Sequence, residues 1–88
     1  MEISWGKIKW TSRRGMRELD LMLLPFVEHD LPQMDESVID DYMELMEASD
    51  LQLVRWFDGS EKADTPSRQK MVDLIRKCHA TRRGREGV

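Results

Sequence analysis

The hydrophobic residues of this chain recur at intervals of three and four, the spacing that places side chains on one face of an α-helix. The pattern is clearest in residues 16–29. One stripe of this segment consists of Met16, Leu19, Leu23, Phe26 and Val27. The opposite side holds Glu18, Leu21, Met22, Pro25 and His29. A helix that is apolar nearly all round is either buried at the centre of a domain or partly covered by a binding partner, and both interpretations stay open.

Pro25 lies inside this second predicted helix. Proline has no backbone N–H and its ring crowds the preceding turn, so we expect a kink in the helix. Carbonyl groups near Leu21 should then lack their usual partner. These carbonyls would lie on the side of the helix that a partner could cover.

Two more helices follow from periodicity and capping residues on either side of this segment. Residues 3–13 form a short amphipathic pattern whose apolar members are Trp5, Ile8 and Trp10. After a connection over residues 30–34 that contains Pro32, Asp35 is a suitable N-cap for a helix that extends to about residue 48.

The last two predicted helices have clear start signals. Ser49 and Gln52 are three residues apart and predict a capping box, which opens a short helix that Gly59 ends. Thr65 followed by Pro66 predicts the start of the final helix. Residues 81–88 have no apolar stripe, so we expect a flexible basic tail after a helical domain of residues 1–80. No alternating pattern predicts a strand. The expected fold is therefore all-α, a small single-domain bundle of five antiparallel helices.

Length and composition fit one small globular domain. The chain has 88 residues, of which 40% are hydrophobic and 35% are charged. The longest apolar run is too short to span a bilayer, and we see no signal peptide. Cys78 is the only cysteine, so an internal disulfide cannot form. We therefore expect a cytoplasmic protein, monomeric and without a membrane-inserted segment.

Charge is segregated along the chain although the net charge is only -3. Residues 21–50 contain nine acidic residues and no Lys or Arg, whereas residues 67–88 contain seven basic and two acidic residues. The simplest interpretation is that these faces solvate the domain. An alternative is that the basic ends bind an acidic partner, either a protein or a nucleic acid. Aromatic residues do not alternate with the C-terminal arginines, so a stacking platform for single strands is not indicated.

The segment of residues 13–20 joins the first two helices and concentrates unusual residue types. Gly15 can adopt a left-handed backbone conformation and so end one helix. Arg13 and Arg14 would then be cations in the last turn of that helix, while Glu18 and Asp20 would lie near the start of the next. A guanidinium, a carboxylate and a residue without a side chain together also suit a site where another protein docks.

The sequence offers little of the chemistry that an enzyme needs. His29 has no His or Cys one helical turn away, so it is a poor candidate for a metal ligand. A small enzyme that uses His29 as a base would need a pocket around it. Cys78 and His79 are adjacent on a helix and therefore point apart, and Cys78 lies on the apolar stripe. No phosphate-binding or dinucleotide-binding motif is present, so we expect neither catalysis nor a tightly bound cofactor.

The run Arg14-Gly15-Met16-Arg17-Glu18 resembles the Arg-Gly-x-x-Glu signature of the succinate dehydrogenase assembly factors, the small flavinylation factors of bacteria and mitochondria. The resemblance covers about residues 7–78. Its further members are Trp10, Glu18-Leu19-Asp20, Pro25-Phe26-Val27-Glu28-His29, Asp50-Leu51 and Trp56. The motif, the order of these residues and the length of the chain together make the resemblance fairly specific.

This resemblance implies a chaperone-like assembly factor, not an enzyme. Such a factor binds the flavoprotein subunit of succinate dehydrogenase and promotes covalent attachment of FAD to it. The flavoprotein subunit of the related fumarate reductase is a second expected partner. The signature residues Arg14, Gly15 and Glu18 would bind the partner. Lower-ranked members of the same surface are Arg13, Met16, Asp20, Glu28 and His29. An antitoxin-like or nucleic-acid-binding regulator that uses the basic ends is the alternative function.

Overall fold

The described part of the protein contains five α-helices. The computed structural model describes residues 3–86, with side chains up to Arg82. The helices are α1 (Trp5–Ser12), α2 (Arg17–Pro25), α3 (Glu36–Leu45), α4 (Asp50–Asp58) and α5 (Pro66–Glu86). A π-helical turn, η1 (Phe26–Asp30), and a 3-10 turn, η2 (Leu31–Gln33), follow α2. No strand occurs among the described residues, so the expected all-α fold is confirmed.

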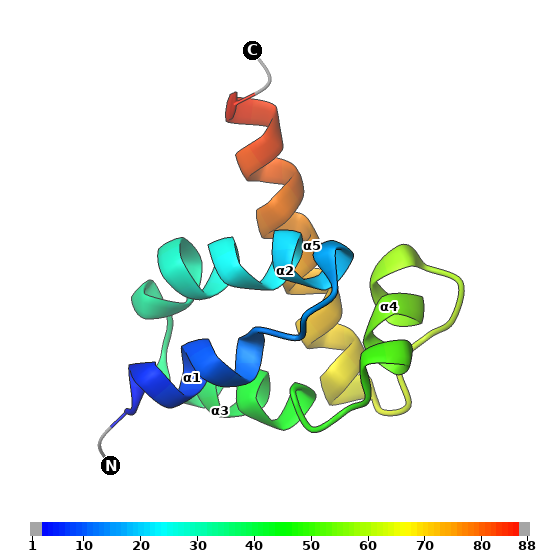
Figure 1. Cartoon of the computed structure of the whole chain (residues 1–88), viewed down its shortest axis with the longest axis horizontal. Coiled ribbons are helices and arrows are strands. Elements are labelled where there is room, and N and C mark those ends of the chain that lie inside the picture. The colour runs from blue at the N-terminus through cyan, green and yellow to red at the C-terminus, as the bar shows by residue number, and fades with distance from the viewer. Residues whose placement is uncertain (1–2, 87–88) are drawn as a thin grey trace.

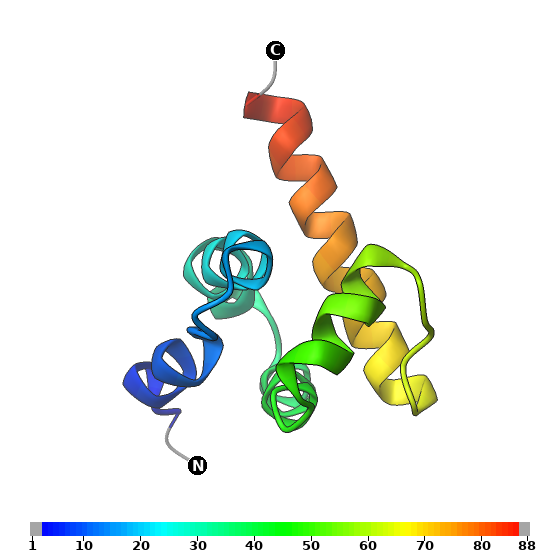
Figure 2. The ribbon, with the colours of Figure 1, turned by 45° about the vertical axis from the view of Figure 1, so that its right-hand side comes forward.

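The longest helix, α5, organises the packing of the others. It contacts α2, η1, α3 and α4. Figures 1 and 2 show that α5 crosses the direction of α2 and α3, and that its C-terminal half projects beyond the other helices. The expectation that all five helices run antiparallel is therefore wrong for α5. Helix periodicity predicts which face of a helix is buried but not the angle at which two helices cross, which side-chain packing decides.

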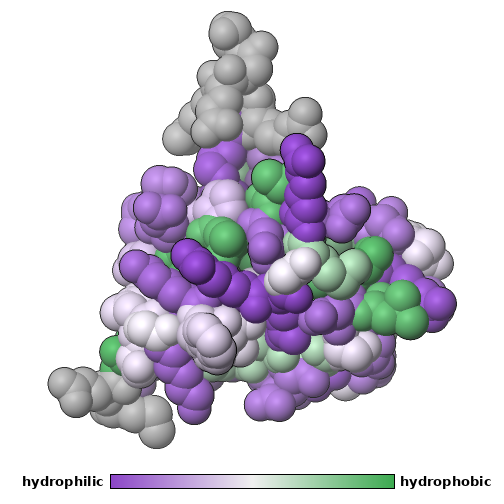
Figure 3. All heavy atoms as spheres, in the orientation of Figure 1, coloured by the Kyte–Doolittle hydropathy of each residue, from purple (hydrophilic) through white to green (hydrophobic). Residues whose placement is uncertain are grey.

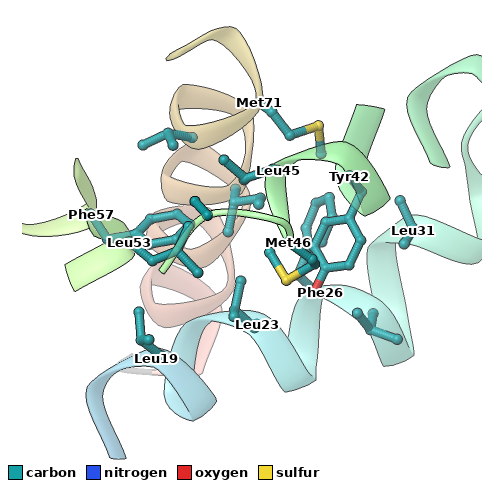
Figure 4. Close-up of a cluster of buried hydrophobic side chains, with 14 of the residues drawn as sticks. Leu19, Leu23, Phe26, Leu31, Tyr42, Leu45, Met46, Leu53, Phe57 and Met71 are labelled. Atoms are coloured by element: carbon teal, nitrogen blue, oxygen red, sulfur yellow. The ribbon is translucent and has the colours of Figure 1, made fainter. Parts of the chain in front are cut away.

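The hydrophobic core lies between α2, α3, α4 and the first half of α5. Figure 4 shows Leu19 and Leu23 of α2 pointing into the same cluster as Leu53 of α4 and Met71 of α5. The rings of Phe26 and Tyr42 pack in a tilted arrangement with 5.6 Å between their centroids. Burying one such large side chain contributes roughly 1.5–3 kcal/mol. The predicted stripe of residues 16–29 is confirmed. Leu19, Leu23, Phe26 and Val27 are buried, and Met16 is half-buried.

The predicted capping residues are confirmed at four helix ends. Asp35 is the N-cap residue of α3, although its side chain makes no capping hydrogen bond. Ser49 and Gln52 form a reciprocal capping box, with distances of 3.2 and 3.0 Å. Gly59 ends α4 in the left-handed region, with φ 85°. The Thr65 hydroxyl accepts a hydrogen bond from the backbone N–H of Arg68.

The backbone around Pro25 differs from the expected kinked α-helix that continues to His29. The α-helix ends at Pro25, and the next five residues form the π-helical turn η1, in which the N–H of Leu31 bonds to the carbonyl of Phe26. Because Pro25 has no N–H, the carbonyl of Leu21 loses its usual partner four residues on. A π-helical turn is wider than an α-helical one, and it is one way for a helix to accommodate this missing hydrogen bond. Residues 31–33, expected to be an open connection, form the 3-10 turn η2.

The first helix buries a different set of residues from the one expected. Ile8 and Ser12 are buried and Trp5 is half-buried, whereas the Trp10 side chain is 79% exposed. Each residue turns the helix by about 100°, so Trp10 lies nearly opposite Ile8. The assignment of Trp10 to the apolar face is therefore wrong.

The C-terminal segment also differs from the expectation of a tail that leaves the helix at residue 81. Helix α5 continues to Glu86, and Arg82 forms an ion pair with Asp30 of η1. The predicted boundary between residues 80 and 81 is thus not a break in the helix, and residues 87–88 lie outside the described part. Cys78, expected in the core, is half-buried at its edge. Within residues 3–86, no helix is long and apolar enough to cross a membrane.

Candidate functional site

The connector between α1 and α2, residues 13–16, has a backbone conformation that requires glycine. Gly15 has φ 76°, in the left-handed region that other residues adopt only with strain. A Cβ atom built at Gly15 would meet nothing within 4 Å. The left-handed conformation was predicted correctly, but the position of the arginines was not. Helix α1 ends at Ser12, so Arg13 is its C-cap residue and Arg14 lies beyond it.

Arg14 points into the protein, away from the surface to which sequence analysis assigned it. Its side chain is only 15% exposed. The guanidinium donates to the backbone carbonyl of Met46, lies 3.5 Å from that of Ala48, and forms an ion pair with Asp50 at 3.2 Å. Met46 and Ala48 lie in the connector between α3 and α4, and Asp50 is the first residue of α4. The last carbonyls of a helix carry partial negative charge, which favours a cation there. The charge of Arg14 is therefore structural, because its contacts hold the α1–α2 connector against the segment that joins α3 to α4.

Two more contacts fix the motif segment from either side. The Asp20 carboxylate accepts a hydrogen bond of 3.1 Å from the backbone N–H of Arg14. The Ser12 hydroxyl donates to the carbonyl of Ile8 at 2.7 Å and lies 2.6 Å from the hydroxyl of Tyr42. Since Ser12 uses its only proton on Ile8, the Tyr42 hydroxyl donates to Ser12. Burial raises the pKa of Tyr42 to about 12, so its phenol keeps its proton at neutral pH.

The other residues proposed to bind a partner are mostly exposed. Glu18 lies in the first turn of α2 and makes no hydrogen bond or ion pair with the described residues. Gly15, Arg13, Glu28 and His29 are also exposed, while Met16 and Asp20 are half-buried. The structure thus divides the motif into residues that face inward, Arg14 and Asp20, and residues that remain available for contact.

A groove runs along the outer side of α2 and η1, where α5 forms its second wall. Its volume is about 670 Å³. Its lining residues are Glu18, Leu21, Met22, Pro25, His29, His79 and Arg82. The first five are the residues that periodicity placed opposite the buried stripe. Leu21 is 56% exposed. Figure 3 shows that hydrophobic surface on the face it displays forms separate patches among hydrophilic side chains.

This groove supplies the concavity that a small enzyme using His29 would need. The described residues do not bring three or more metal-ligating side chains together, and His29 and His79 lie on different walls of the groove. Burial and the nearby carboxylate of Asp30 raise the pKa of the Cys78 thiol, which disfavours the nucleophilic thiolate. The arrangement is better suited to binding than to bond-making chemistry.

Sequence reasoning missed the residues that support the motif from a distance. Ser12, Tyr42 and Asp50 hold the connector, and Arg82 completes the groove. Tyr42 is 30 residues from Ser12 and Asp50 is 36 residues from Arg14, so no local pattern reports the contacts. A weak signal existed for Asp50, an acidic residue at the start of a helix that could accept a bond from a nearby arginine.

Comparison with known proteins gives a consistent result. A family model described as flavinator of succinate dehydrogenase matches residues 6–79. The FAD assembly factor SdhE of Pasteurella multocida is 39% identical over 71 residues, which cover 81% of this chain and 84% of the relative. The FAD assembly factors SdhE of Vibrio cholerae and Pseudomonas putida are 39% and 35% identical, each over 70 residues. These matches cover 80% of this chain and, in that order, 81% and 83% of the relative. The chain therefore belongs to the flavinator of succinate dehydrogenase family.

Proposed function

We propose that this protein binds the flavoprotein subunit of succinate dehydrogenase and promotes covalent attachment of FAD to it. The family and the names of the relatives support this assignment. The structural observation that carries it is the shape of the connector. Gly15 and Glu18 are exposed, and the backbone that presents them is fixed by the inward contacts of Arg14.

A fixed, side-chain-free backbone is useful for close approach to another protein. At Gly15 the open space around the missing Cβ lets a partner backbone come near without a clash. The Glu18 carboxylate can then accept hydrogen bonds from the partner, where partial burial would strengthen them. Because the connector is already ordered, binding does not incur the entropy cost of fixing it.

The protein would promote flavin attachment through differential binding rather than through its own chemistry. If it binds the partner more tightly in the state where the flavin and the accepting side chain are aligned, it raises the population of that state. No bond to this chain is needed. Arg14 and Asp20 are engaged in internal contacts, so they position the contact surface instead of reacting. On this account the protein is not an enzyme.

We also propose that the chain holds no FAD tightly. Trp, Tyr and Phe are absent from the lining of the groove between α2, η1 and α5, so an isoalloxazine ring has no aromatic face on which to stack there. The flavoprotein subunit of fumarate reductase is a further candidate partner. A cytoplasmic monomer is the form in which we expect the protein to act.

A flavin-fluorescence gel tests the proposed function directly. The apo flavoprotein subunit is incubated with FAD, with and without this protein, then denatured and separated. We expect a fluorescent band of the flavoprotein whose intensity depends on this chain. The gel is repeated with the variant Glu18→Gln. Glu36→Gln is its matched control, since both glutamates are exposed in the first turn of a helix. Equal flavin attachment in the presence and absence of the chain would disprove the proposal.

A further inference from the structure

The groove between α2, η1 and α5 has two chemically different parts. Its floor is apolar, with Leu21, Met22 and Pro25 contributed by α2. Its second wall comes from α5, which contributes His79 and Arg82. Glu18 lies in the same groove, so the motif carboxylate and the C-terminal helix face one continuous depression.

The cationic character of the α5 wall continues along the part of the helix that projects from the domain. Residues 76–86 contain five Lys or Arg and one acidic residue. In Figure 2 this part of α5 extends past all other helices. Such a surface complements a negatively charged partner and accelerates its encounter.

Arg82 links this charge to the groove itself. Its side chain is 17% exposed and pairs with Asp30, but its Nη2 atom is buried and has no hydrogen-bond partner within the described chain. A buried donor without an acceptor is costly, so a carboxylate that enters the groove and reaches this guanidinium would be favoured.

From these observations we infer that the groove binds an acidic segment of the partner flavoprotein that carries an apolar anchor residue. The anchor packs on Leu21, Met22 and Pro25, and a carboxylate of the segment pairs with Arg82. This inference rests on the proposed function and adds a second contact surface, made by α5, to the one around Gly15. The apolar floor and the lack of aromatic side chains favour a protein segment over a nucleic acid.

The test measures binding of the full chain to the purified apo flavoprotein subunit, with association and dissociation rates followed separately. Leu21→Ser removes the floor contact, and Leu51→Ser is its matched control, because Leu51 is 58% exposed on α4 and does not line the groove. We expect Leu21→Ser to weaken binding about tenfold, mainly through faster dissociation. Leu51→Ser should change the affinity by less than about twofold.

A second pair of variants separates the charge of Arg82 from its ion pair. Arg82→Gln and Asp30→Asn both remove the pair, but only the first removes the cation. We expect Arg82→Gln to weaken binding about tenfold, and Asp30→Asn to leave it unchanged or tighten it. Thermal melts of both variants report any shared loss of stability. Equal weakening by the two variants would overturn the inference, because the ion pair and not the cation would then matter.

The outcomes distinguish the inference from the function on which it rests. If the unsubstituted chain binds the subunit and promotes flavin attachment while all four variants behave like it, the groove proposal is wrong and the proposed function stands. If the unsubstituted chain does not bind the subunit, both fail. Binding of a labelled DNA duplex that Arg82→Gln abolishes would assign the basic wall to nucleic acid and also overturn the inference.

Discussion

Arg14 and Asp50 are 36 residues apart in the sequence, and their side chains form an ion pair of 3.2 Å in the folded protein. The same guanidinium bonds to the carbonyl of Met46. A residue of the family signature thus makes internal contacts, and these contacts fix the backbone next to Gly15. Variants of Arg14 should therefore reduce partner binding by disturbing the connector.

The first prediction concerns the shape of the Arg14 side chain. Arg14→Lys keeps the charge but replaces the planar fork with one ammonium group, which cannot serve both carbonyls and Asp50 together. We expect a loss of about 1–3 kcal/mol in the free energy of unfolding, measured by urea denaturation. Arg13→Lys, at an exposed neighbouring position, should change it by less than about 0.5 kcal/mol. If both variants were equally stable, the internal contacts of Arg14 would contribute little.

The second prediction separates backbone strain from steric access at Gly15. Gly15→Ala should destabilise the fold by about 1 kcal/mol because of the positive φ, and Gly15→Leu by a similar amount because the space is open. Flavin attachment should fall much further with Leu than with Ala, since only the larger side chain blocks a partner backbone. Gly59→Ala has the same backbone strain outside the site and should leave flavin attachment intact. Equal activity of the Ala and Leu variants would argue against close approach at Gly15.

The third prediction concerns Glu18, which is exposed and makes no hydrogen bond or ion pair with the described residues. Glu18→Gln should leave the thermal melt nearly unchanged, because exposed charges contribute little to stability. Binding to the apo flavoprotein should weaken, with a cost of about 2–5 kcal/mol if the partner's charge is left buried and unpaired. Titration calorimetry of this variant beside Glu36→Gln measures the difference. A lower melting temperature for Glu18→Gln alone would make the glutamate structural.

The fourth prediction follows from the raised pKa of Tyr42. The folded pKa of about 12 exceeds the unfolded value of 10.0, so the folded state holds its proton more tightly. The associated stability is complete below pH 10.0 and is lost as the pH rises toward 12. Tyr42→Phe removes this titration and should flatten the fall in stability with pH over that range. Tyr42 is the only tyrosine, so tyrosinate absorbance reports its ionisation without interference. Ionisation near pH 10.0 in the folded protein would contradict the assigned burial.

The sequence predicts the local features of this fold well. Capping residues set the starts of α3, α4 and α5, and helical periodicity identifies the groove-lining side of α2. Both kinds of information are contained within a few neighbouring residues. The resemblance to the family rests on the motif of residues 14–18 together with the order of further residues over about residues 7–78, and the family assignment is confirmed.

Features that depend on distant residues could not be predicted. The inward orientation of Arg14 is decided by carbonyls 32 and 34 residues away. The π-helical turn after Pro25 depends on how the chain accommodates a missing N–H while Phe26 and Val27 remain buried, which sequence spacing does not reveal. Helix α5 passes residue 81 despite weak helix formers, and the Arg82–Asp30 ion pair is one contact that stabilises it there. The role of the candidate residues in partner binding remains a prediction.

The contacts of Arg14 with the segment of residues 46–50 also determine when, during synthesis of the chain, the surface around Gly15 can be completed. The acceptors of its guanidinium are Met46, Ala48 and Asp50, so these contacts of the connector around Gly15 cannot form while that later segment is missing or unfolded. A chain emerging from the ribosome would display the motif sequence long before it displays the motif geometry. If the surface around Gly15 binds the partner as proposed, a partly synthesised chain should therefore not bind it.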